Sequence, residues 1–180
     1  MQIFDSSDRY GAVSRGLHWA VAVLILWQFL GMGLKLIFGR NEFVGFFVGT
    51  HQPVGFVIFW LVVFRALWAL ASRKRRPDHG TGMLAKAAAA GHFLLYALMI
   101  AIPTLALLRA WGGTRGFAPL GFEVFAPREV EIAWATSLAG LLHGELGWVL
   151  AVLIVGHIAM VAVHERFWRD GTLRKMAGRR

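Results

Sequence analysis

The sequence predicts an all-α integral membrane protein, a four-helix bundle with both termini in the cytoplasm. Apolar residues make up 57% of the chain and charged residues only 16%, and the mean hydropathy is +0.58, which leaves too little polar surface for a soluble domain. Four windows of 18 to 22 residues contain no Asp, Glu, Lys or Arg: 16–34, 43–64, 87–108 and 146–163. Each is close to the ~20 residues that a helix needs to cross a bilayer.

The distribution of charge gives the orientation. Residues 1–15, 65–86 and 164–180 together carry fourteen Lys/Arg against five Asp/Glu, whereas the remaining ends and loops carry five of each. This asymmetry follows the positive-inside rule and predicts cytoplasmic termini. The basic run at residues 73–76 is interpreted first as a topology signal and second as a lipid or ligand site.

The elements follow in order within a single domain, residues 1–180. Residues 1–13 are polar and are expected at the inner surface, and the first helix spans residues 14–38, with Lys35 reaching outward. Thr50 offers an N-cap, with Pro53 in the first turn, so the second helix spans 50–71. Residues 43–49 are an interfacial or re-entrant piece.

The third helix is expected over residues 84–108, with a kink at Pro103. Glycine and proline are frequent between residues 109 and 137, which predicts a long outer loop with one short surface helix near residues 130–135. The fourth helix spans 138–167, and a basic tail follows. We expect the first helix to remain in the mature protein, because its apolar stretch is long enough to span and no Ala-x-Ala site follows it.

The composition excludes several classes of function. Four spans with short loops leave no room for a soluble enzyme or a nucleic-acid-binding fold, and long apolar windows do not suit a membrane β-barrel. The chain has no cysteine, which removes disulfides, Cys-ligated iron–sulfur clusters, zinc–thiolate sites and covalently attached haem.

Histidines supply the candidate chemistry. The chain has seven, and five lie within or at the edges of spans, where an ionisable side chain indicates function. A single such histidine is more simply a neutral imidazole bonded to a carbonyl group. However, His18 and His157 lie at similar depths near the inner side, and His51 and His143 lie at similar depths near the outer side. The four therefore form two pairs by depth.

His143 and His157 are fourteen residues apart, so they lie within about 40° of one helix face and ~21 Å apart along the axis. Gly140 and Gly147 flank His143, and Gly55 follows His51 by one turn. These glycines leave bare patches for a flat ring, or else allow close helix packing. Zinc requires three or four protein ligands, whereas haem needs only two axial ones. Two haem b groups are thus the best fit, and an iron with two histidines has no open position, which favours electron transfer.

Other polar residues have open alternatives. Arg65 follows His51 by fourteen residues and either pairs with the propionates of the inner haem or extends to the headgroups, and Arg15 has the same two interpretations. His164 is a rival axial ligand, although it lies near the aqueous boundary. His92 is more simply a hydrogen-bonding group, to a propionate or a quinone, and His79 is expected in solvent.

These residues resemble the bacterial cytochrome b561 family of small dihaem membrane cytochromes. The matching motifs are Arg15-Gly-Leu-His18-Trp19, His51, Gly91-His92 with Tyr96 and Pro103, His143-Gly-Glu145, Gly156-His157, and the closing segment from His164 to Leu173. The resemblance implies axial pairs His18/His157 and His51/His143, a place in the bacterial inner membrane, and electron exchange with quinone. A superoxide-oxidising member would reduce ubiquinone with electrons from periplasmic superoxide, which makes a superoxide:quinone oxidoreductase the most concrete expectation.

Two other functions stay open on the sequence. One is a cytochrome b subunit that serves a separate dehydrogenase, hydrogenase or periplasmic redox protein. The other is a haem-free membrane transporter or assembly factor, whose histidines bind a metal or protons.

Overall fold

The computed structural model describes residues 2–77 and 81–178. Over these residues the chain is helical and has no β-strand, only an isolated bridge between Phe117 and Phe125. Four segments are long and apolar enough to cross a membrane: Ala12–Phe38, Glu42–Ala71, Met83–Gly112 and Ala133–Trp168. The predicted fold class, an all-α membrane protein with four spans, is confirmed.

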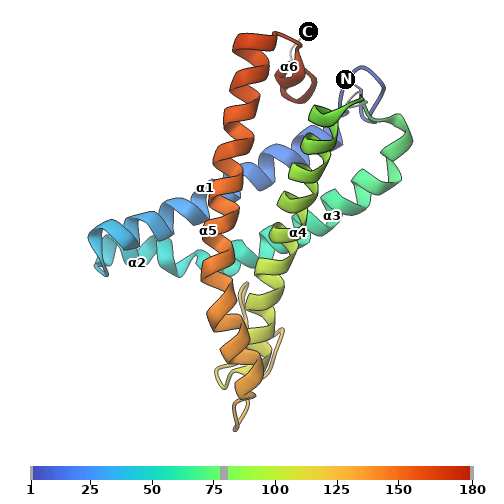
Figure 1. The fold of residues 1–180 in the computed structure, drawn as a ribbon. Coiled ribbons are helices and arrows are strands. Elements are labelled where there is room, and N and C mark those ends of the chain that lie inside the picture. Colours follow the sequence, from blue (N-terminus) through green and yellow to red (C-terminus); the bar gives the residue numbers. More distant parts are fainter. Residues whose placement is uncertain (1, 78–80, 179–180) are drawn as a thin grey trace.

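The helices form two antiparallel hairpins that cross each other (Figure 1). In the first hairpin, α1 (Ala12–Phe38) runs beside α2 (Glu42–Gly49) and α3 (His51–Ala71); in the second, α4 (Met83–Gly112) packs along α5 (Ala133–Val163). The core lies at the crossing and contains residues from all four long helices: Val21, Ile25, Ile58, Val62, Met99 and Leu150. We call this cluster the apolar septum, and we call the two sides of it the termini side and the distal side.

The break between α2 and α3 is held by side-chain hydrogen bonds, one of which comes from Trp27 of α1. Asn41 caps α2, because its side chain accepts a hydrogen bond from the Val44 N–H (2.9 Å). Thr50 occupies the N-cap position of α3, but it makes no side-chain cap. Its hydroxyl instead donates to the Phe47 carbonyl (2.7 Å) and accepts from Trp27 Nε1 (2.9 Å). The piece at 43–49 is thus a short helix fixed against α1.

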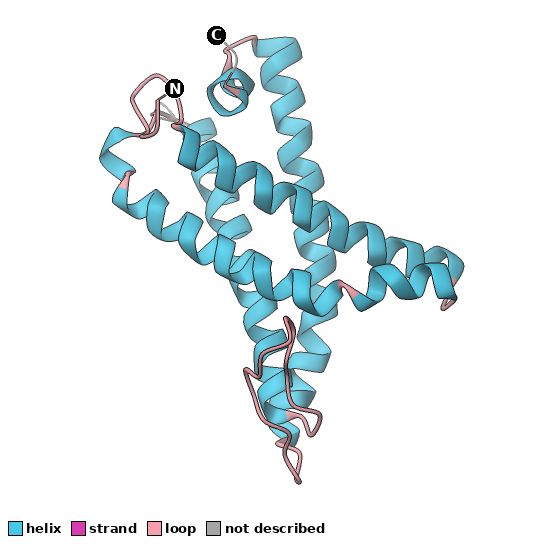
Figure 2. Ribbon diagram, turned by 180° about the vertical axis from the view of Figure 1, so that it is seen from behind, coloured by secondary structure: helices cyan, strands magenta, loops and turns pink. Residues whose placement is uncertain are grey.

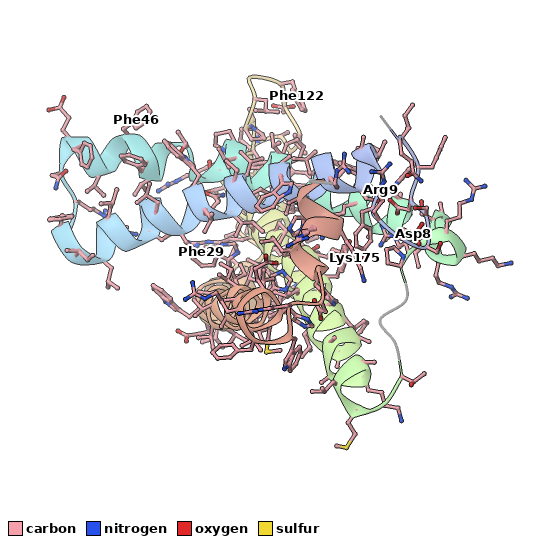
Figure 3. All side chains as sticks on the ribbon, turned by 90° about the horizontal axis from the view of Figure 1, so that it is seen from above. Asp8, Arg9, Phe29, Phe46, Phe122 and Lys175 are labelled. Carbon is pink, nitrogen blue, oxygen red and sulfur yellow. The ribbon has the colours of Figure 1, made fainter. Side chains whose placement is uncertain are left out.

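Both chain ends fold over the termini side. Tyr10 N–H donates to the Lys175 carbonyl (3.3 Å), and Trp19 Nε1 donates to the Met176 carbonyl (3.3 Å). Lys175 and Met176 belong to α6 (Thr172–Ala177), which follows η2 (His164–Trp168), a π-helical turn that continues α5. Seen from above in Figure 3, Lys175 lies near the first turns of α1, while Phe46 lies far out on α2.

The predicted surface helix at residues 130–135 is wrong. These residues lead directly into α5, which begins at Ala133, five residues earlier than expected, and α4 continues to Gly112. The physical reason is that no glycine or proline lies between Pro127 and the start of α5 to end a separate helix. The Ile132 N–H donates to the Gly112 carbonyl (2.8 Å), so the two helices meet as soon as the loop closes.

The loop that remains, residues 113–132, folds back along the bundle (Figure 2). Phe117 and Phe122 each pack edge-on against Phe56 of α3, with ring centres 5.9 and 6.1 Å away. The loop is therefore attached to the first hairpin as well as to the second.

Candidate functional site

On the termini side, α1 and α5 bring His18 and His157 together, with ring centres 6.4 Å apart. His92 of α4 lies next to them, with its ring centre 5.5 Å from that of His157. Three helices thus contribute one imidazole each to this side.

On the distal side, α3 and α5 bring His51 and His143 together, with ring centres 6.0 Å apart. Their planes are inclined by 77°. Both histidines of α5 therefore meet a histidine of the first hairpin, one on each side of the apolar septum.

The separation within each pair is suited to one shared metal ion. An imidazole nitrogen binds a transition metal at about 2 Å and the ring centre lies roughly 1 Å behind it, so two axial imidazoles place their centres about 6 Å apart. No group of three or more His, Cys, Asp and Glu in the described part of the chain is arranged to hold a metal. Each pair thus suits a metal that brings its own equatorial ligands, as haem iron does.

Hydrogen bonding prepares the distal pair for this role. The Nδ1 atom of His143 lies 3.0 Å from the Ile102 carbonyl. Because a carbonyl only accepts, Nδ1 carries the proton, and the lone pair of Nε2 is available to a metal. His51 Nδ1 is buried, and the described residues offer it no hydrogen-bond partner. The described residues therefore leave this ring incompletely bonded.

A cavity of about 1130 Å³ opens beside the distal pair. Its lining includes both histidines and five glycines, of which Gly55, Gly144 and Gly147 belong to the helices that carry the pair. At Gly144 and Gly147 an added Cβ would meet no atom within 4 Å, so these residues leave open space for a flat group. Gly140, which the sequence also suggested, is not part of the lining.

The termini-side pair is in a different state of hydrogen bonding. Arg65 Nη2 lies 2.9 Å from His18 Nδ1. Because a guanidinium only donates, Nδ1 is the acceptor and the proton of His18 lies on Nε2. In this arrangement Nε2 has no free lone pair, so a metal can bind there only if Arg65 releases the ring.

The structure also places the secondary candidates. Arg15 donates to the Tyr10 carbonyl (3.3 Å). Its guanidinium lies beside Gly178, where an added Cβ would come within 2.8 Å of Arg15 Cζ. His164 Nδ1 pairs with Asp170 (2.5 Å) and its ring contacts Trp168, away from the two histidine pairs. His79 lies outside the described residues.

Comparison with known proteins identifies the family of this chain. Residues 9–179 match the family described as Prokaryotic cytochrome b561. The chain belongs to the prokaryotic cytochrome b561 family. It is therefore a membrane cytochrome b that takes part in electron transfer, and the family implies that it binds haem b.

Two relatives from Escherichia coli (strain K12) are similar over nearly their whole length. Cytochrome b561 homolog 2 is 27% identical over 181 residues, which cover 99% of this chain and 96% of the relative. Cytochrome b561 homolog 1 is 25% identical over 178 residues, which cover 96% and 99% respectively.

Sequence reasoning missed two residues that position His51 in this cytochrome. Gln28 Nε2 donates to the His51 carbonyl (2.9 Å), and Trp27 holds Thr50 just before it. Gln28 is the one polar side chain that could have signalled this contact, since it lies in a window otherwise free of amide and charged groups. Its partner, however, is a backbone atom of another helix, which a sequence pattern does not reveal.

Proposed function

We propose that this cytochrome holds two haem b groups, one between His18 and His157 and one between His51 and His143. The observation that carries the proposal is the pairing itself: two histidine pairs, each about 6 Å between ring centres, on opposite sides of the apolar septum. Haem held by these histidines would supply reversible one-electron chemistry.

The residues around the pairs have separate tasks. On the distal side, the Ile102 carbonyl orients His143, Gln28 holds the backbone of His51, and the glycines keep the cavity open. On the termini side, Arg65 would have to release His18 for haem to bind, and it would then be free to pair with a haem propionate. The septum keeps water out between the two pairs, so that electrons and not ions pass across the membrane.

We propose further that the two haems connect the quinone pool with a second redox partner, and that superoxide is the most concrete donor. Two superoxide ions would each lose one electron to give oxygen, and ubiquinone would take up the two electrons and two protons to give ubiquinol. This reaction would make the protein a superoxide:quinone oxidoreductase of the bacterial inner membrane. Membership of the cytochrome b561 family supports electron transfer. The positive-inside rule predicts that the distal side faces the periplasm.

The decisive test is haem content in His143→Ala. We expect the purified variant to contain half the haem of the wild type, with the low-spin b-type bands of the termini-side haem unchanged, because that variant removes one ligand of one pair only. His164→Ala is the matched control and should retain all the haem. Loss of all haem, or of none, in His143→Ala would contradict the pairing.

Adding superoxide with and without ubiquinone tests the reaction. Haem bands that are reduced by superoxide and reoxidised by quinone would support the oxidase. Bands that do not respond would indicate a subunit that serves another redox protein, and a wild-type protein without haem would favour the transporter or assembly factor.

A further inference from the structure

The lining of the distal cavity has a net positive charge, and we call its cations the rim. Three cations line it, Lys35 of α1, Arg109 of α4 and Arg115 of the long loop, against one carboxylate, Glu131. None of the three makes an ion pair or a side-chain hydrogen bond with another described residue. The other distal arginine of the loop, Arg128, is already bound, since it donates to the Trp111 carbonyl (2.8 Å) and lies over the Trp111 ring.

Lys35 and Arg109 are placed equivalently with respect to the histidine pair. Gln28 contacts His51, and Lys35 follows Gln28 by seven residues; Ile102 contacts His143, and Arg109 follows Ile102 by seven residues. Seven residues return a helix to within about 20° of the same face and advance it about 10 Å. Both cations therefore lie on the cavity face, two turns beyond the histidine of their own hairpin.

The direction of the helices turns both side chains toward the pair. In a helix, the Cα–Cβ bond leans toward the N-terminus. The chain of α1 and of α4 runs from the termini side to the distal side, so the Cα–Cβ bonds of Lys35 and Arg109 lean back toward the side of the histidines. Arg115 reaches the same rim because the loop is attached to α3 through Phe117 and Phe56. Three separate segments thus each contribute one cation to the lining of this cavity.

We propose that Lys35, Arg109 and Arg115 bind the two carboxylates of the distal haem. The inference rests on the proposed function, because it requires haem between His51 and His143. A porphyrin that enters this apolar cavity carries two negative propionates, and the rim is the cationic part of the lining. The three cations would hold these propionates at the cationic part of the lining and so orient the ring.

Haem and its dimethyl ester distinguish this role from a general effect on the cavity, because the ester keeps the ring and the iron but has no negative charge. The full-length apoprotein in detergent is loaded with either compound, and the rate of release of distal haem to apomyoglobin is measured. In Lys35→Met/Arg109→Gln/Arg115→Gln we expect release of haem to accelerate about tenfold, since each exposed pair contributes modestly. Release of the dimethyl ester should not change.

Arg40→Gln removes a distal cation that does not line the cavity and is the matched control. Arg109→Gln and Arg115→Gln are also made singly, in case the triple variant does not fold. Both residues are exposed, so we expect each single variant to fold.

Raised ionic strength should accelerate release of haem from the wild type and not from the triple variant.

The outcomes separate this inference from the proposed function. If wild-type protein holds no haem at the distal pair, the proposed function itself fails. If haem binds but is released equally from the wild type and the variants, the rim binds a free anion or none, and the inference is overturned. Equal acceleration for haem and ester also overturns it, since the variants would then have damaged the cavity rather than a charge pair.

Discussion

The hydrogen bond between Arg65 and His18 fixes the position of one proton. With Arg65 as donor, His18 holds its proton on Nε2, and the ring cannot bind iron through that atom. Arg65 also lies over the Tyr96 ring, 5.0 Å from its centre, and has no carboxylate partner among the described residues. A partly buried guanidinium without a carboxylate partner suits an anion, and on the proposed function a haem propionate would be that anion.

Arg65→Met is therefore expected to weaken binding of the termini-side haem by about tenfold to a hundredfold, as loss of one charged hydrogen bond does. This affinity is measured by titrating the apoprotein with haem and following the two sets of b-type bands. The distal haem serves as the internal control. If the termini-side haem binds more tightly in Arg65→Met, the arginine only competes for His18 and the propionate role is wrong.

At the scale of elements, the second hairpin depends on a close contact where α4 meets α5. An added Cβ at Gly112 would lie 2.9 Å from the Ala135 Cβ and 3.3 Å from the Ile132 carbonyl oxygen. Ala135 is fully buried, so neither helix can yield without moving the other. The short distance between α4 and α5 here sets the position of Arg109 and of the long loop.

Gly112→Ala should lower the free energy of unfolding by about 1–3 kcal/mol, as overpacking of a tight contact does. Thermal unfolding in detergent measures the change. Gly91→Ala lies in the same helix, where a Cβ meets no atom within 4 Å, and should be neutral or slightly stabilising. Equal effects of the two substitutions would contradict the packing argument.

The C-terminal elements have a pH-sensitive contact. Burial raises the pKa of Asp170, but hydrogen bonds from Thr172 and His164 outweigh it and lower the pKa from 3.8 to about 2. A carboxyl whose folded pKa is depressed stabilises the fold above its ordinary pKa, and this stabilisation is lost as pH falls through about 2. Asp170 is solvent-exposed, so the contribution is small.

We expect pepsin to cleave near α6 faster at pH 2 than at pH 4, after correction with an unstructured peptide. In Asp170→Asn the cleavage rate should already be raised at pH 4 and should not depend further on pH. A pH dependence that is the same in the variant would assign the effect to another group.

At the scale of the whole molecule, Asp5 ties the N-terminal segment and the start of α1 to the distant basic run. Its buried carboxylate accepts hydrogen bonds from Gly11 N–H (2.7 Å), Ser14 Oγ (2.8 Å) and Arg76 Nε (3.0 Å). Ser14 Oγ in turn accepts a hydrogen bond from Trp68 Nε1 (3.0 Å). The N-terminal segment, α1, α3 and the basic run thus share one buried network on the termini side.

Asp5→Asn should lower the free energy of unfolding by about 2 kcal/mol or more, because Arg76 loses the charge that compensates its own. Thermal unfolding in detergent measures it, and Asp8→Asn, at an exposed carboxylate, is the control. Full stability of Asp5→Asn would show that the network does not hold the chain ends in place.

The sequence by itself determined the four spans, because crossing a bilayer requires long apolar helices and leaves few alternatives. It also predicted which histidines lie at equal depth, since depth follows from position along a helix. Which side chains touch was decided by the tertiary structure: the crossing of the hairpins set the distances within each pair and placed Arg65 on His18. It also made Lys35, Arg109 and Arg115 part of the lining of one cavity. The sequence pattern predicted only a polar N-terminal segment where Asp5 lies, and it missed the start of α5 at Ala133. The role of Asp5 and the start of α5 both depend on contacts between segments far apart in the sequence, which local patterns do not contain.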